Sequence, residues 1–146
     1  ISSNFMKFAI IRTTPIGKNK YRSNFLTWFM SQINNYEKVS LYSNIFFTPI
    51  DLQNLTDSIS FIIENEINGI YHVVSNDRIS KYDFCMELSK YLKIDGNLLL
   101  NSNYIPDSKS ALRSLDQSMD NSKFNILYNN KLPNLQGVIK NIINDL

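Results

Sequence analysis

Short, mainly apolar runs at several places along the chain predict β-strands. Residues 7–13 and 70–74 are runs of the kind found in strands buried on both faces of a parallel sheet. Two further short strands are expected at 38–42 and 44–48. Pro49 should end the second of them, because proline has no N–H to donate to a neighbouring strand.

Four segments carry apolar residues at helical spacing. The predicted helices begin near Asn24, Asp51, Ser80 and Pro133. The second has the clearest pattern, a single apolar stripe made of Leu52, Leu55, Ile59, Ile62 and Ile63. We expect it to end near Asn68–Gly69, since glycine is the usual residue just past a helix C-terminus. Residues 94–123 are less regular and predict loops. Strands that alternate with helices in this way predict an α/β fold.

The composition is that of one folded domain. The chain has 146 residues, of which 43% are hydrophobic and 19% charged. No apolar run approaches the roughly 18 residues of a membrane span and no cleavable signal pattern opens the chain, so we expect no membrane partner and a cytoplasmic location. Cys85 and His72 are the only residues of their types, which excludes an internal disulfide and a Cys/His zinc site. Both are interpreted as core residues, and no metal site is expected.

Positive charge is concentrated near the start of the sequence. The residues before Glu37 include no acid and five bases: Lys7, Arg12, Lys18, Lys20 and Arg22. This segment is either a solvated loop around Gly17, the favoured interpretation, or a surface that faces an anion. Nucleic-acid binding is the least favoured reading, because no RNA-binding motif surrounds the basic residues.

Two arrangements expected of a complete nucleotide-dependent oxidoreductase are absent. The glycines, at positions 17, 69, 96 and 137, form neither GxGxxG nor GxxxxGK, so no loop in the chain is suited to cradle a phosphate. None of the eight tyrosines is followed four residues later by lysine, the pair that would supply a general acid with a lowered pKa. No catalytic residue is therefore predicted in this chain.

The order of several segments nevertheless resembles a known family. In sequence they are IIRT, a proline/glycine loop, NF at the start of a helix, FFTPIDLQNLTDSI, GIYHVVSNDRISKYDFCMEL and RSLDQSMDNSKF. Together they resemble the C-terminal half of the extended short-chain dehydrogenase/reductase family, in particular the branch of dTDP-4-dehydrorhamnose reductases. The resemblance runs from about Phe8 to Leu146. It implies the C-terminal part of a Rossmann-type fold, with short parallel strands, flanking helices and a small lobe that binds a nucleotide sugar.

The departures from the family define what this chain would be. Members carry a glycine-rich loop and a Tyr-xxx-Lys pair upstream of the strand that here reads FAIIRT. Residues 1–146 would then be a single partial domain, the substrate-binding half, with the N-terminal cofactor-binding half absent. NAD or NADP would be bound by the full-length protein, and none is expected for this chain alone. Ser114 replaces a usual proline, and the aromatic residue that follows the RT pair is missing.

The resemblance also implies substrate-binding residues. Arg113 is similar to the family arginine that meets the substrate's diphosphate, which suits the two-pronged guanidinium. Its alternative is a surface arginine paired with Asp116 or Asp120. Asn24 resembles the asparagine at the start of the substrate-side helix, where its amide and the exposed backbone N–H groups would meet a phosphate. Its alternative is a plain helix cap.

Cofactor binding is implied for one corner of the chain. Thr48, Pro49 and Ile50 resemble the strand-to-helix corner near the nicotinamide end of the cofactor, although the favoured interpretation is that they only end a strand. The pair Trp28 and Phe29 is interpreted as core packing rather than as a platform for a base.

Two functions remain open. The leading hypothesis is the nucleotide-sugar-binding part of a reductase or epimerase-like oxidoreductase, inactive as an isolated chain, whose partners are the nucleotide sugar and its own N-terminal half. The alternative is a non-catalytic nucleotide-sugar-binding or regulatory subunit with the same fold. A glycine-rich loop and a Tyr-xxx-Lys pair in the upstream gene sequence would favour the enzyme. A homodimer is left open.

Overall fold

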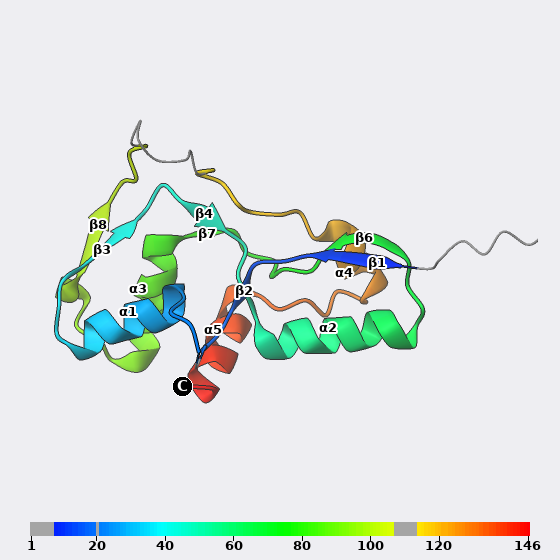
Figure 1. Ribbon diagram of the computed structural model, residues 1–146, viewed down its shortest axis with the longest axis horizontal. Helices are drawn as coiled ribbons and strands as arrows, with labels where there is room; N and C mark the ends of the chain where they lie inside the picture. The colour runs from blue at the N-terminus through cyan, green and yellow to red at the C-terminus, as the bar shows by residue number, and fades with distance from the viewer. Residues whose placement is uncertain (1–7, 20, 107–113) are drawn as a thin grey trace, which may run out of the picture.

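A computed structural model describes residues 8–19, 21–106 and 114–146 (Figure 1). The strands are β1 (Ala9–Arg12), β2 (Pro15–Ile16), β3 (Val39–Tyr42), β4 (Phe46–Phe47), β5 (Ile50–Asp51), β6 (Gly69–His72), β7 (Ile79–Ser80) and β8 (Leu99–Ser102). The α-helices are α1 (Phe25–Asn34), α2 (Leu52–Glu64), α3 (Lys81–Leu92), α4 (Ser122–Leu127) and α5 (Leu135–Asn144), and a short 3₁₀ helix covers Gly96–Leu98.

The strands pair two by two, mostly in parallel. β1 runs parallel to β6, from Ala9 opposite Gly69 to Arg12 opposite His72. β2 pairs in parallel with β5, and β3 with β8, whereas β4 and β7 are antiparallel. Parallel strands joined through helices confirm the predicted α/β class. The strand β8 and the helix α4 were not expected, because they lie in or next to the segment that the sequence predicts as loops.

The elements form two lobes with α5 between them (Figure 1). In the β1–β6 lobe, α2 and α4 cover the strand pair, and the core includes Tyr71, Val73 and Phe124. In the β3–β8 lobe, α1 and α3 pack together around Phe29 and Phe84, both fully buried. Helix α5 contributes Val138, Ile139 and Ile142 to this second core. Its Asn141 also donates a hydrogen bond of 3.0 Å to Asp51, the N-cap of α2, which ties the two lobes together.

Helix α2 ends earlier than the sequence predicts. It stops at Glu64, and Gly69 instead begins β6. The N–H of Glu66 donates to the carbonyl of Ile63, and the N–H of Ile67 donates to that of Ile62. This is a Schellman turn, in which Glu66 takes the left-handed conformation (φ 47°) usually left to glycine. The predicted end of the helix was wrong because it assumed that a glycine takes the left-handed position after the helix, whereas Glu66 takes it.

The predicted apolar stripe of α2 is also wrong in part. Ile62 is buried, but Leu52, Ile59 and Ile63 are exposed, Ile63 by 70%. The buried face includes Ser58, whose hydroxyl donates to the Asn54 carbonyl and so needs no polar partner outside the helix. The helix therefore presents much of its apolar stripe to solvent within this chain.

Three single-residue interpretations can be compared with the structure. Cys85 is fully buried, as predicted. His72 is only half-buried, and its Nδ1 lies 2.8 Å from the carbonyl oxygen of Asp120, so it is a satisfied side chain at the lobe surface rather than a core residue. Phe29 is in the core, but Trp28 is 38% exposed and lines a cavity described below. Within the described ranges, no helix is long and apolar enough to cross a membrane.

Candidate functional site

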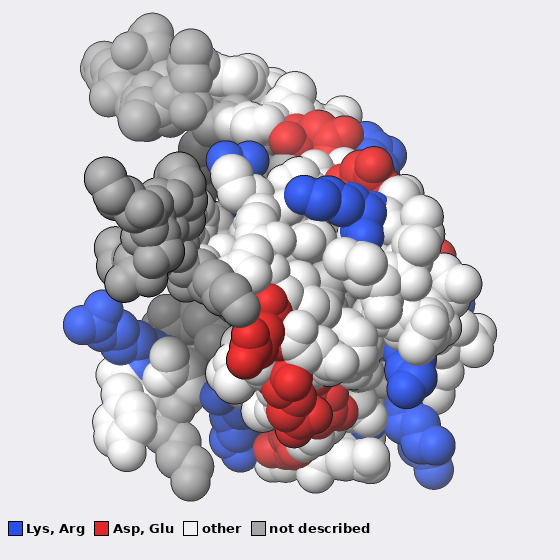
Figure 2. Space-filling model, turned by 90° about the vertical axis from the view of Figure 1, so that its right-hand side faces the viewer, with Lys and Arg blue, Asp and Glu red and all other residues white. Residues whose placement is uncertain are grey.

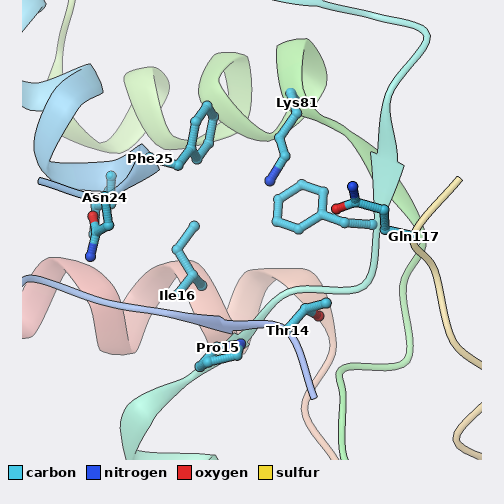
Figure 3. Close-up of a pocket in the computed structure, with 9 residues that line it drawn as sticks. Thr14, Pro15, Ile16, Asn24, Phe25, Lys81 and Gln117 are labelled. Carbon is cyan, nitrogen blue, oxygen red and sulfur yellow. The ribbon is translucent and has the colours of Figure 1, made fainter. Parts of the chain in front are cut away.

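A cavity of about 250 Å³ lies where β2 passes the first turns of α1 and α3 (Figure 3). Five segments line it: Thr14, Pro15 and Ile16 around β2; Asn24, Phe25 and Leu26 at the start of α1; Phe47 of β4; Lys81 of α3; and Gln117. Both helices begin at the cavity, so the positive ends of two helix dipoles point toward it. This arrangement favours a ligand with negative charge.

Asn24 forms the corner between β2 and α1. Its Oδ1 accepts from the N–H of Thr27 at 2.9 Å, and the Thr27 hydroxyl accepts from the Asn24 N–H at 2.8 Å, which together form a capping box. Its Nδ2 donates to the carbonyl of Gly17 at 2.9 Å. The structure therefore confirms the helix cap, and it places the residue in the cavity wall as well. The predicted contact with a phosphate stays a prediction.

Gln117 reaches the cavity because its segment pairs with β4. The N–H of Phe46 donates to the Leu115 carbonyl at 2.8 Å, and the N–H of Gln117 donates to the Phe46 carbonyl at 2.9 Å. Asp116 lies between these two residues and accepts from Arg78 Nη2 at 2.8 Å. Hydrogen bonds from Ser118, followed by those from Arg78, lower the pKa of Asp116 to about 2.

Lys81 is the first residue of α3, directly after its N-cap Ser80. Its backbone N–H donates to the carbonyl of Ile45 at 3.0 Å. The side chain extends into the cavity between Phe25 and Gln117 (Figure 3). Its Nζ lies 3.5 Å from the centroid of the Phe47 ring and 4.4 Å from that of Phe25, so two aromatic faces stabilise the ammonium group.

No acid among the described residues balances the charge on Lys81. Among the described residues, those that line the cavity include no aspartate or glutamate, and no carboxylate forms an ion pair with Lys81. Burial lowers the pKa of this lysine from 10.5 to about 8, because water is partly removed from the ammonium group. At neutral pH the group is still mainly protonated, so the cavity holds a cation to which the described residues supply no anionic partner.

A second cavity, of about 330 Å³, adjoins the first. The two share Phe25, Lys81 and Gln117. The remaining wall of the second cavity is more aromatic and consists of Trp28, Ser40, Leu41, Tyr42 and Ile45. Lys81 therefore stands at the boundary of two adjacent spaces, one on each side of Phe25.

The other predicted site residues do not join this cavity. Thr48 and Pro49 are buried between β4 and β5, and Ile50 is buried as the first residue of β5. The Thr48 hydroxyl accepts from the N–H of Met119, the Thr48 carbonyl accepts from the Thr14 hydroxyl, and the Ile50 N–H donates to the Thr14 carbonyl. These residues thus end one strand and begin the next. Whether they also contact a cofactor stays a prediction.

Arg113 lies outside the described residues. The alternative interpretation of Arg113 was a surface arginine paired with Asp116 or Asp120. Both aspartates have other partners among the described residues. Asp116 pairs with Arg78, and Asp120 accepts from the N–H and hydroxyl of Ser122 at 3.0 and 2.5 Å. The hydrogen bonds from Ser122 lower the pKa of Asp120.

Sequence reasoning missed Lys81 and Gln117. The helix that begins after Ser80 was predicted, so the position of Lys81 in its first turn could have been stated. No pattern in the sequence indicates that this lysine faces Phe25 and Phe47, since the three residues are far apart in the chain. Gln117 depends on the pairing of its segment with β4, which is equally non-local.

Parallel strands with flanking helices place the chain among the Rossmann-like α/β proteins. It matches the RmlD substrate binding domain over residues 1–146, and it belongs to that family. A search of curated protein sequences gave no match.

Solved structures with the same fold include the dTDP-4-dehydrorhamnose reductase of Bacillus anthracis, in complex with NADP (TM-score 0.79, 20% identity, 94% of this chain and 48% of that one). The dTDP-4-dehydrorhamnose reductase of Yersinia enterocolitica is similar (TM-score 0.78, 20% identity, 94% of this chain and 49% of that one). The dTDP-glucose 4,6-dehydratase of B. anthracis, in complex with NAD, also matches (TM-score 0.68, 10% identity, 90% of this chain and 43% of that one). The chain therefore spans about half the length of these proteins.

Proposed function

We propose that this chain is the nucleotide-sugar-binding part of an NAD(P)-dependent reductase or epimerase-like oxidoreductase, and that the ligand enters the cavity at the starts of α1 and α3. The observation that carries the proposal is the convergence of Asn24, Lys81 and two helix N-termini on one cavity free of described acids. A diphosphate is the part of a nucleotide sugar that such a site would attract. Membership of the RmlD substrate binding domain family supports the same ligand class.

Arg113 belongs to the proposal through the family resemblance alone. A guanidinium can form two parallel hydrogen bonds to one phosphate, which an ammonium group cannot. We propose that it contributes to the diphosphate contact together with the Asn24 corner.

The surface of the β1–β6 lobe supports a larger protein as the active form. Among the described strands, β1 pairs only with β6, so its other edge is open. Phe8 is 60% exposed and Ile10 45% exposed, although the sequence predicts a strand buried on both faces. Phe8 and Ile63 also line one open depression. Figure 2 shows uncharged surface over much of the described part of this end of the molecule, a contiguous group of acidic side chains near its lower centre, and basic side chains at several separate places.

The occupant that we propose for this open edge is the N-terminal, cofactor-binding half of the same protein. The related structures are about twice as long as this chain, so they contain a part of the right size. A parallel strand added beside β1 would satisfy its free backbone groups and cover Phe8, Ile10 and Ile63. The proposed domain organisation follows: residues 1–146 form a partial domain, and the cofactor-binding half precedes it.

The cofactor is proposed for the full-length protein only. Within this chain the Thr48 hydroxyl and carbonyl and the Ile50 N–H already have partners in the fold, and a contact of this corner with the nicotinamide end of the cofactor stays a prediction for the full-length protein. The sequence also has no glycine-rich loop. We therefore derive no reaction step through NAD or NADP here, and we expect the isolated chain to be inactive.

Titration of the chain with dTDP tests the proposal. Trp28 is the only tryptophan and lines the second cavity, so its fluorescence reports on occupancy there. Saturable binding of dTDP, with little response to the neutral nucleoside thymidine, is the expected result. Equal and weak responses to both would contradict a nucleotide-diphosphate site. Saturable binding of NADH by the isolated chain would contradict the assignment of the cofactor to the N-terminal half.

A further inference from the structure

We propose that Lys81 is an anion-recognition residue, and that it binds a phosphate group of the ligand at the boundary of the two cavities. The inference deepens the proposed function and rests on it for the identity of the ligand. Neither the family match nor any motif in the sequence singles out this lysine. The chemistry that it recognises, an organic phosphate, is inferred from the geometry of the side chain.

The first argument is the position of the ammonium group. Lys81 lines both cavities, so a ligand that extends from one into the other passes its Nζ. The part of the ligand at that point should be negative. In a nucleotide sugar the diphosphate is the middle of the molecule, between the sugar and the nucleoside.

The second argument is the lack of a competing partner. In the described part of the chain, the groups near Lys81 on its own helix and around the two cavities are Asp83, Cys85, Tyr42 and, next to Gln117, Asp116 with its partner Arg78. Asp83 accepts a hydrogen bond of 2.6 Å from the Ser80 hydroxyl and lines neither cavity. Cys85 is buried and burial raises the pKa of its thiol to about 12, so it is neutral. Tyr42 lines the second cavity, and Asp116 is held by Arg78. None of these supplies a free negative charge to Lys81.

The third argument is that the rings hold the lysine without neutralising it. The faces of Phe47 and Phe25 attract the ammonium group but carry no net charge. They also restrict the side chain to one region, which reduces the entropy lost when an anion binds. A lysine that is held by rings and still lacks an anion is suited to complete its ion pair with a ligand.

Proton uptake is a measurable consequence. With a pKa of about 8, Lys81 is about half deprotonated at pH 8, and a bound phosphate favours the charged form. Binding of dTDP at pH 8 should then take up about half a proton per ligand, because the phosphates themselves are already ionised there. Affinity should fall as the pH rises from 7 to 9.

The experiment compares wild type with Lys81→Met, which keeps the aliphatic stem over the rings but removes the charge. Lys90→Met is the matched control, because Lys90 lies on the same helix and is exposed and paired with Glu87. The probes are dTDP, inorganic pyrophosphate and thymidine. We expect Lys81→Met to weaken dTDP and pyrophosphate about tenfold or more, with thymidine unchanged and Lys90→Met equal to wild type.

The outcomes separate this inference from the proposed function. If wild type binds dTDP and Lys81→Met binds it equally well, Lys81 is only a packing residue and the inference fails, while the proposed function stands. If wild type binds pyrophosphate as tightly as dTDP and Lys81→Met weakens both, Lys81 is confirmed as an anion-binding residue. The site would then not be specific for a nucleotide, and the proposed function would fail. If neither probe binds, both fail.

A measurement on the wild type keeps the test valid should Lys81→Met not fold. Calorimetry at pH 8 in two buffers of different ionisation enthalpy counts the protons taken up when dTDP binds. An uptake of zero at pH 8, together with an affinity for dTDP that stays constant as the pH is raised through the ordinary lysine pKa of 10.5, would overturn the assignment of the anion contact to Lys81.

Discussion

Lys81 and Cys85 lie one turn apart on α3, and burial shifts their pKa values in opposite directions. That of the lysine falls from 10.5 to about 8, and that of the thiol rises from 9.0 to about 12. Both side chains therefore favour their neutral forms in the folded protein. In the unfolded chain Lys81 holds its proton up to about pH 10.5, whereas Cys85 loses its proton above about pH 9.

The pair predicts how stability changes with pH. Between pH 8 and 9 the unfolded chain binds more protons than the folded one because of Lys81, so its contribution to the free energy of unfolding rises with pH. Above pH 9 the unfolded thiol ionises, and this opposes the further gain from the lysine. We expect a rise of roughly 1 kcal/mol from Lys81 across the first interval, because one proton of difference changes the free energy of unfolding by about 1.4 kcal/mol per pH unit and the folded lysine is only partly deprotonated in this range.

Urea unfolding at pH 7, 8 and 9 measures this dependence. In Lys81→Met the rise attributed to Lys81 should disappear, whereas Lys90→Met should keep it. A wild-type curve no steeper between pH 8 and 9 than that of Lys81→Met would show that the lysine is not desolvated in the folded protein.

A second prediction concerns the two isoleucines on α2. Ile62 is 4% exposed and packs in the core of the β1–β6 lobe, whereas Ile59 is 36% exposed. Ile62→Ala should lower the free energy of unfolding by about 2–5 kcal/mol, and Ile59→Ala by less than about 1 kcal/mol. Denaturant unfolding of the two variants provides the comparison. Equal losses would mean that the helix buries its whole apolar stripe in this chain.

The difference between these isoleucines shows that an apolar pattern in the sequence does not predict which of its residues are buried in this chain. The helix starts near Asn24, Asp51 and Ser80 were predicted correctly, because a helix start depends on the capping residue and its next few neighbours. For the first helix the sequence left Ser23 or Asn24 as the cap, and the structure shows Asn24. The apolar stripe of α2 indicates which residues avoid water, but not whether this chain supplies their partners. Ile59 and Ile63 are on the stripe and remain exposed.

Non-local pairing limits the prediction of both the fold and the site. The β1 and β6 runs could be recognised as parallel strands from their apolar content. Residues 99–102 could not, because they form a strand by pairing with β3, about 60 residues earlier in the chain. Lys81 has the same limitation, since its role depends on Phe25 and Phe47, which the fold brings beside it.

A third prediction separates the cap function of Asn24 from ligand binding. Asn24→Asp keeps the acceptor for the Thr27 N–H, and the charge that the helix N-terminus favours offsets part of the cost of losing the Nδ2 hydrogen bond to the Gly17 carbonyl, so stability should fall by no more than about 2 kcal/mol. The carboxylate would repel a phosphate in the cavity, and dTDP binding should weaken about tenfold. Asn134→Asp is the control, because Asn134 caps α5 and does not line the cavity. Wild-type affinity in Asn24→Asp would remove Asn24 from the phosphate site and leave it as a cap.

The last prediction concerns Arg113, which the family resemblance assigns to the diphosphate. Losing one charge-assisted contact to a phosphate typically costs about 1.5–3 kcal/mol, so Arg113→Ala should weaken dTDP binding by about 10- to 150-fold without loss of stability. Arg113→Lys should fall between wild type and Ala, because lysine retains the charge and lacks the planar fork. Arg12→Ala, a change on exposed β1, is the control. If Arg113→Ala binds dTDP as wild type does while Lys81→Met does not, the diphosphate is recognised by Lys81 at the helix starts, and the arginine assigned by resemblance has no part in binding.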